Sequence, residues 1–352
     1  MNITLNQGKD EVQLKEWYEE IRPLYEMLGK KVKDIIEDML SEGGIQVHSI
    51  DFRAKEVDSF VKKAIKDKYT YPQEEIHDLV GIRVITFVKS DVIKVCDVIK
   101  PLFKIDNDNS SDKGKELGDN KVGYRSVHYV AELTESRTDL PENKKYKGIK
   151  FEIQVRTILE HAWADISHDK DYKFKGVLPV ENDIKRRFSL AAATLELLDR
   201  EFDNISKEID EYENVLNKET DVGNLKYPID SISLNILLKR VFSKEIEDGE
   251  ITPTFNSIEE TLIEELELFG LKTIEDIDVL ITKTPKGDII NNNNFVGILR
   301  YIMIIDNPEK YFNKAWRNGW ASIDEPTFKI LDKINPNVKD YIIENEIDIN
   351  KY

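Results

Sequence analysis

Three short stretches of this 352-residue sequence combine charged residues in arrangements suited to phosphate chemistry. The first contains Arg53, Lys55, Ser59 and Lys63. We predict a helix over residues 53–68, on which the two lysines and the serine stand at positions i, i+4 and i+8 of one face. Cations and a hydroxyl group along one stripe suit a polyphosphate, although an ordinary solvated helix face has a similar composition.

The second and third stretches each supply a carboxylate beside a predicted strand. Asp78 precedes the β-branched stretch 81–88, which predicts a buried strand. Glu152 belongs to another predicted strand, over residues 148–155. Mg²⁺ is typically held by one or two carboxylates together with substrate phosphates. If the strands are neighbours, Asp78 and Glu152 form the two-carboxylate arrangement used in phosphoryl-type transfer.

The strand over residues 148–155 has two chemically different faces. Successive strand residues point to opposite sides of a sheet. One face is therefore apolar core, and the other presents a carboxylate, an amide and a guanidinium to a common surface. The apolar face consists of Phe151, Ile153 and Val155, and the polar face of Glu152, Gln154 and Arg156.

The elements that position these residues follow from the hydrophobic periodicity. Apolar residues at helical spacing predict helices, and short β-branched stretches predict strands. A polar, glycine-containing stretch predicts a mobile loop. The predicted helices cover residues 11–40, 53–68, 91–103 and the stretch from 157 onward; the strands cover 81–88, 126–133 and 148–155; the loop covers 105–121.

Residues 188–216 carry apolar side chains at alternating spacings of three and four. This pattern is typical of a helix packed lengthwise on another helix, either within a core or in a homo-oligomer. The pattern stops near residue 221, where we place the boundary between domains 1–220 and 221–352. The second domain has no catalytic grouping, and we expect an interaction or regulatory role. Its predicted helices cover residues 259–269, 294–305, 308–316 and 326–334.

The overall composition excludes several classes of protein. Acidic residues outnumber basic ones by 68 to 51, a net charge of −17, whereas non-specific nucleic-acid binding needs a basic footprint. The single cysteine, Cys96, has no partner for an internal disulfide. No stretch approaches the roughly 20 apolar residues that span a bilayer. We therefore expect a cytoplasmic globular protein with no membrane partner.

Five blocks follow one another along the chain: RAKEVDSFVKK, IHDLVGIRV, GYRSVHY, FEIQVRT and HAWADISHDKDYK. Together and in this order, they resemble the synthetase domain of the RelA/SpoT-like alarmone synthetases. The resemblance covers about residues 50–175, with helical flanks to about 217. It implies an α+β fold with a mixed, nucleotidyltransferase-like β-sheet flanked by helices. The chain would then be a small alarmone synthetase or a related toxin synthetase with a mostly helical C-terminal extension.

The resemblance implies a Mg²⁺-dependent activity. Pyrophosphate would move from ATP to the 3′-hydroxyl of GDP or GTP, which releases AMP and makes (p)ppGpp, the alarmone of the stringent response. Asp78 would bind Mg²⁺, and Glu152 would act as a second metal ligand or as the general base. For the donor ATP, Arg53 and Arg83 would clamp the adenine, while Lys55, Ser59 and Lys63 would contact the phosphates.

The resemblance also implies contacts to the acceptor nucleotide. Tyr124 would stack on its base, and His128 would bind near its phosphates or sugar. Gln154 and Arg156 would support the same side of the acceptor site. Apart from the resemblance, Lys113, Lys115 and Lys121 could neutralise acceptor phosphates.

One departure from the family pattern leaves the acceptor open. The family usually has an asparagine directly before the glycine of the GYRSVHY block, and here Val122 takes its place. The alternative acceptor is the 3′ end of tRNA, as in toxin members, with Lys30–Lys33 and Lys144–Lys147 as candidate basic patches. A third alternative, from another class, is a catalytically inactive regulatory module.

Overall fold

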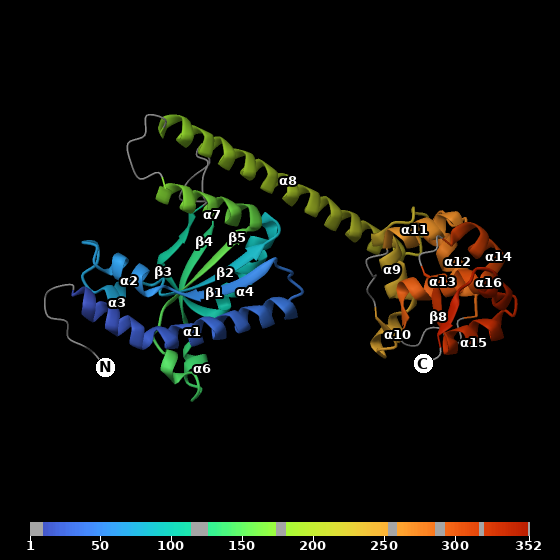
Figure 1. The fold of residues 1–352 in the computed structure, drawn as a ribbon, viewed down its shortest axis with the longest axis horizontal. Helices are drawn as coiled ribbons and strands as arrows, with labels where there is room; N and C mark the ends of the chain where they lie inside the picture. The colour runs from blue at the N-terminus through green and yellow to red at the C-terminus, as the bar shows by residue number, and fades with distance from the viewer. Residues whose placement is uncertain are drawn as a thin grey trace. The chain divides into compact units, whose positions relative to one another are not determined.

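The computed structural model describes residues 10–113, 126–173, 181–252, 259–285, 293–316 and 320–350. The chain divides into two compact units, Met1–Lys207 and Glu208–Tyr352, and each has its own hydrophobic core. Helix α8, Glu181–Asp221, contributes residues to both units (Figure 1). The assignment of residues 1–220 and 221–352 to separate functions stays a prediction.

A five-stranded mixed β-sheet forms the centre of the first unit (Figure 1). The strands lie in the order β1-β2-β5-β4-β3, with β2 and β5 parallel and every other neighbouring pair antiparallel. This arrangement confirms the predicted fold class. The strands are β1 (Ser49–Ala54), β2 (Val80–Thr86), β3 (Phe103–Asp112), β4 (Val127–Leu133) and β5 (Phe151–Thr157).

Helices cover both faces of the sheet, and Figure 1 shows α1 and α7 on opposite sides of it. Helix α1 presents a fully buried apolar stripe that includes Leu28, Val32 and Ile36 to the core face. Among the described residues, the helices of this unit are α1 (Glu11–Glu42), α2 (Val57–Ala64), α3 (Pro72–Glu75), α4 (Lys89–Leu102), α6 (Glu135–Thr138), α7 (Ile158–Lys173) and the first part of α8, with a 3₁₀ turn η1 (Lys144–Tyr146).

The predicted division of β5 into an apolar and a polar face is confirmed. Phe151, Ile153 and Val155 have no exposed surface and belong to the core. The polar face follows from the strand register, because residues paired across neighbouring strands project from the same side. Gly81 lies opposite both Arg53 and Glu152, and Gln154 lies opposite both Arg83 and His128. Side chains at these positions therefore share one face.

The predicted helix over residues 53–68 is wrong at its start. Arg53 is in strand β1, and helix α2 begins only at Val57. The reason is the alternation of Ile50 and Phe52 with Asp51 and Arg53, which suits an edge strand with one face on the core. Lys55 therefore precedes the helix instead of standing one turn before Ser59.

The predicted loop over residues 105–121 is wrong for its first part, because residues 105–112 belong to strand β3. The strand pairs with β4, and the register shifts between Asp106 and Ser111. A strand at the edge of a sheet needs backbone partners on one side only, so polar side chains are tolerated there. Residues 114–121 lie outside the described part of the chain.

Helix α8 confirms the helical interpretation of residues 188–216. Within the first unit, the side chains of Leu198, Phe202 and Ile205 on this helix are 42%, 50% and 45% exposed. The core alternative therefore does not hold for these three side chains. Self-association through this helix stays a prediction.

The second unit is mostly helical, as predicted, and also contains two small two-stranded sheets. Its core surrounds a buried ion pair in which Arg300 Nε and Nη2 each donate to Glu265 at 2.7 Å. The elements that the structure describes in this unit are α9 (Ser231–Val241), α10 (Ser243–Glu247), β6 (Ile251–Thr252), α11 (Glu259–Leu268), α12 (Ile274–Lys283), β7 (Asn293–Asn294), α13 (Phe295–Asp306), α14 (Pro308–Lys310), a π-helical turn η3 (Tyr311–Ala315), β8 (Ser322–Asp324), α15 (Glu325–Ile334), α16 (Val338–Glu344) and β9 (Asp348–Asn350).

Within the described part of the chain, no helix combines the length and the apolar character that crossing a membrane requires.

The close approach of α1 to the sheet at Gly29 gives a stability prediction. A Cβ atom there would lie 2.6 Å from Phe52 Cδ2 and 2.8 Å from Val80 Cγ2. Overpacking a core typically costs about 1–3 kcal/mol, whereas replacing a helical glycine by alanine gains about 1 kcal/mol. Gly29→Ala should therefore lower the free energy of unfolding by about 1 kcal/mol in urea denaturation. In the matched control, Gly81→Ala, the added methyl group meets nothing within 4 Å. An equal decrease in the free energy of unfolding in both variants would contradict the packing argument.

Candidate active site

A cavity of about 520 Å³ lies beside the start of β2. Three predicted site residues line it: Lys63 from α2, Asp78 from the segment before β2, and Glu152 from β5. The structure thus brings together a cation and two carboxylates that lie far apart in the sequence. The other lining residues are Lys68, Tyr69, Glu74, Glu75, His77, Asn109, Val130 and Lys150.

Asp78 is the centre of a charged cluster. Lys55 Nζ and Lys63 Nζ donate to its Oδ2 atom at 2.9 and 2.8 Å. Burial alone would raise the pKa of Asp78, but the two ammonium groups outweigh burial and hold the pKa below its ordinary value. The pKa of Lys63 is raised, because its hydrogen bond to Asp78 outweighs the effect of burial. Asp78 and Lys63 are therefore both charged at neutral pH.

The other carboxylate oxygen of Asp78, Oδ1, differs from Oδ2 in its hydrogen bonding. Atom Oδ1 is buried and accepts no hydrogen bond from the residues that the structure describes. A buried carboxylate oxygen without a partner is unfavourable unless a ligand completes it. The atom is thus a candidate contact for a bound cation.

Glu152 is held in place by its neighbours on the sheet. His128 Nδ1 lies 2.7 Å from Oε1, and Gln154 Nε2 donates to Oε2 at 2.9 Å. Burial raises the pKa of Glu152, but the hydrogen bond to His128 outweighs it, and the pKa lies below its ordinary value. The negative charge of Asp78 acts in the opposite sense on Glu152, so the two carboxylates are within electrostatic reach.

Arg156 lies at the opposite end of β5 from Glu152 and faces α7. Its side chain is 3% exposed. Its Nη2 atom lies 2.6 Å from His161 Nδ1 and 3.8 Å from Asp165 Oδ1. Burial and the charge of Arg156 lower the pKa of His161, so its neutral ring accepts the hydrogen bond from the guanidinium. Arg156 thus fastens α7 to the polar face of the sheet.

The remaining predicted residues lie outside the cavity lining. Ser59 is exposed on α2, one turn before Lys63. Arg53 and Arg83 share the polar face of the sheet with Glu152, on strands β1 and β2. Lys121 and Tyr124 lie outside the described residues.

An ion pair at the cavity was not predicted from the sequence. Lys150 Nζ lies 2.7 Å from Asp106 Oδ2, and hydrogen bonds from Lys150 and Asn109 lower the pKa of Asp106 to about 2. Lys150 stands two residues before Glu152, so extending the alternation of β5 by one step would have found it. Asp106 was not identified as a site residue because residues 105–121 were predicted to form a loop. His77 was also missed, and burial together with the charge of Lys150 lowers its pKa.

The two carboxylates fit Mg²⁺. Among the described residues there is no group of three or more histidine, cysteine, aspartate or glutamate side chains that would form a complete protein cage. Mg²⁺ does not need such a cage, because it usually keeps several waters and takes one or two carboxylates plus substrate phosphates. Asp78 Oδ1 and the Glu152 carboxylate are ligands of this kind.

Comparison with known proteins places this region in a family. Residues 52–177 match the family described as "Region found in RelA / SpoT proteins". GTP pyrophosphokinase YwaC of Bacillus subtilis (strain 168) is 30% identical over 167 residues, which are 45% of this chain and 73% of that protein. GTP pyrophosphokinase YjbM of the same strain is 30% identical over 161 residues, 45% of this chain and 72% of that protein.

Solved structures also match part of the chain. A GTP pyrophosphokinase family protein from Streptococcus pneumoniae is 27% identical, with a TM-score of 0.46 over 56% of this chain and 96% of that chain. On the strength of the sequence relatives, the chain belongs to the RelA/SpoT-like alarmone synthetase family.

The two lysines on Asp78 give a pH-dependent stability prediction. Because the folded pKa of Asp78 is depressed, its ion pairs stabilise the protein above the ordinary value of 3.8, and this contribution is lost as the pH falls through the folded pKa. Asp78→Asn should lower the free energy of unfolding by about 1–3 kcal/mol at pH 7. The difference in the free energy of unfolding between variant and wild type, measured by urea denaturation, should become smaller as the pH falls from about 5 to about 3.

Asp67→Asn is the matched control, since Asp67 is exposed on the turn after α2. Its effect should be small at every pH. If the difference in unfolding free energy between Asp78→Asn and the wild type stays constant between about pH 7 and pH 3, this would contradict the assigned ion pairs.

Proposed function

We propose that the protein transfers pyrophosphate from ATP to the 3′-hydroxyl of GDP or GTP. The observation that carries this proposal is the cavity in which Asp78 and Glu152 meet Lys63, with Lys55 bound to Asp78. The hydroxyl oxygen forms a bond to the β-phosphorus of ATP, and the bond from that phosphorus to the oxygen bridging the α-phosphate breaks. AMP leaves, and the acceptor gains a 3′-diphosphate.

On the donor side, the lysines supply positive charge for the phosphates. Lys55 and Lys63 reach a single carboxylate oxygen, so their ammonium groups lie close together before any substrate binds. Such preorganised charge stabilises a phosphoryl transition state without reorganisation during the reaction. Ser59 stands on the same helix as Lys63, and Arg53 and Arg83 on the neighbouring strands are proposed to hold the adenine.

Mg²⁺, held by Asp78 with Glu152, would neutralise charge on the transferred diphosphate. We also propose that Glu152 orients the attacking hydroxyl group and accepts its proton. Its depressed pKa keeps it ionised, and His128 and Gln154 fix its two oxygens. These contacts favour a positioned carboxylate, as in-line attack requires.

On the acceptor side, we propose His128, Gln154 and Arg156 along the sheet, with Tyr124 and Lys121 from the segment between β3 and β4. The ion pairs within one candidate basic patch favour a guanosine nucleotide over tRNA as the acceptor. Lys30 and Lys33 pair with acidic residues one turn later on α1, namely Asp34 and Glu37. Their charge is thus largely cancelled within the helix.

Identification of the products tests the acceptor. The full-length protein with Mg²⁺ and labelled ATP should form AMP together with a 3′-pyrophosphorylated nucleotide when GDP or GTP is present. Label transferred to tRNA instead would support the toxin-type alternative. AMP formed with no acceptor modified would contradict both transferase hypotheses, and no AMP in any mixture would support an inactive module.

Removal of the Glu152 charge tests the site. Glu152→Gln should lower the rate of AMP formation by about 100-fold or more, because the cation ligand and the group facing the hydroxyl are both lost. The matched control is Glu132→Gln on neighbouring β4, whose carboxylate pairs with Lys104 outside the cavity lining. Near-normal turnover in Glu152→Gln, with folding intact by circular dichroism, would refute the assigned role.

A further inference from the structure

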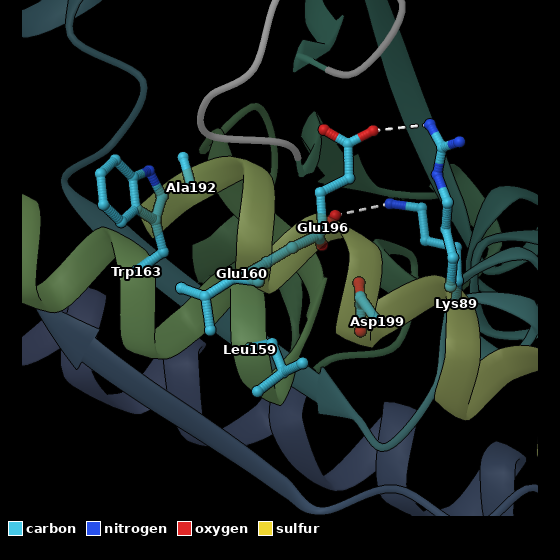
Figure 2. Close-up of a pocket in the computed structure, with 9 residues that line it drawn as sticks. Lys89, Leu159, Glu160, Trp163, Ala192, Glu196 and Asp199 are labelled. Atoms are coloured by element: carbon cyan, nitrogen blue, oxygen red, sulfur yellow. Dashed lines mark hydrogen bonds and ion pairs between the residues drawn. The ribbon is translucent and has the colours of Figure 1, made fainter. Parts of the chain in front are cut away.

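A second cavity, of about 140 Å³, lies between α7 and α8 in the first unit (Figure 2). It shares no lining residue with the cavity that holds Asp78 and Glu152. Its apolar wall consists of Leu159 and Trp163 from α7 and Ala192 and Leu195 from α8. Figure 2 shows Trp163 and Lys89 at opposite ends of this cavity.

Four of the five charged side chains that line this cavity form ion pairs. Lys89 Nζ lies 2.6 Å from Glu160 Oε1, and Arg200 Nη2 lies 2.6 Å from Glu196 Oε1. Each of these pairs is neutral, and both are drawn in Figure 2. The fifth charged side chain, Asp199, pairs with no cation among the residues that the structure describes. The cavity lining therefore carries one uncompensated negative charge when Asp199 is ionised.

Asp199 is 6% exposed and has one satisfied oxygen. Its Oδ2 atom accepts a hydrogen bond from Thr157 Oγ1 at 3.0 Å, whereas the buried Oδ1 atom has no hydrogen-bond partner within the described ranges. A buried carboxylate without a counter-charge is costly, and a group in this state points to a missing ligand.

The groups packed around Asp199 do not supply that counter-charge. Burial and the charge of Glu160 on α7 raise its pKa to about 6, with a smaller contribution from Asp203 on α8. Lys89, at the start of α4, acts in the opposite sense but is engaged by Glu160. Thr157, at the end of β5, offers only a neutral hydroxyl group.

We propose that this cavity is a binding site for a small organic cation of the primary alkylammonium class. The ammonium group would pair with Asp199 Oδ1, and the alkyl chain would pack on the apolar wall. The charge fits, because a monocation neutralises the cavity. The size also fits, since an apolar cavity of about 150 Å³ accommodates a molecule such as benzene.

Three ligands of the same length separate charge from shape. n-Butylammonium, 1-butanol and butyrate would each be titrated into the full-length protein at about pH 7.5 and followed by calorimetry. n-Butylammonium should bind at one saturable site, and the neutral and anionic analogues should bind at least about tenfold more weakly. If 1-butanol binds with the same affinity as n-butylammonium, the cavity selects its ligand by apolar shape alone and the proposal is overturned. The absence of n-butylammonium binding would overturn it as well.

A matched pair of variants tests the counter-ion. Asp199→Asn should weaken n-butylammonium binding at least about tenfold. Asp203→Asn removes the acid one turn later on α8, which binds Ser90 and Lys207 and does not line the cavity, and it should leave the affinity nearly unchanged. Equal effects in the two variants, or none in Asp199→Asn, would overturn the proposal.

Three further measurements test the counter-ion and distinguish this site from the active site and from an inorganic cation site. Because protonated Asp199 cannot serve as the counter-ion, the affinity of the wild type should rise as the pH increases from about 5 to about 7. Glu152→Gln should bind n-butylammonium like the wild type, so this test is independent of pyrophosphate transfer. Displacement of n-butylammonium by equimolar K⁺ would instead indicate an inorganic cation site and overturn the proposal.

Discussion

The parallel pairing of β2 with β5 is the constraint on which the candidate active site depends. Gly81 of β2 lies opposite Glu152 of β5, and both strands run in the same direction. The segment before β2, which carries Asp78, therefore reaches the end of β5 that carries Glu152. The register is held from the other face by Ile82 and Ile153, which have no exposed surface. A slip of one residue would turn Glu152 into the core and is excluded for that reason.

Burial acts in the same sense on Asp78, Glu152 and Asp199, yet the pKa values of these three carboxyl groups move in different directions. Asp78 has two ammonium groups and Glu152 has His128 and Gln154, and both pKa values are lowered. Asp199 accepts a hydrogen bond from the hydroxyl of Thr157, and its pKa is raised to about 6. The first two carboxylates are thus prepared to act as anions before any substrate binds. The third lacks, among the described residues, the cation that would make its ionised form favourable.

How well each element could be predicted from the sequence follows the strength of its local pattern. The faces of β5 were predicted correctly because three apolar residues at a period of two must enter a core. The start of the helix near Arg53 was wrong, because the lysine spacing suited a helix while the apolar residues Ile50 and Phe52 already followed a strand period. Strand β3 was missed because an edge strand is held by backbone hydrogen bonds with β4, which polar side chains do not reveal.

The sequence by itself determined the residue types of the site, the polar face of β5 and the family, because these are carried by short ordered blocks and local periodicity. Only the tertiary structure decided which side chains meet. It showed that Lys55 reaches Asp78 from outside the helix, that Lys150 pairs with Asp106, and that Asp199 is buried without a cation in the described part of the chain. Such contacts join residues far apart in the chain, and they depend on strand order and on helix packing. No local spacing in the sequence encodes either property.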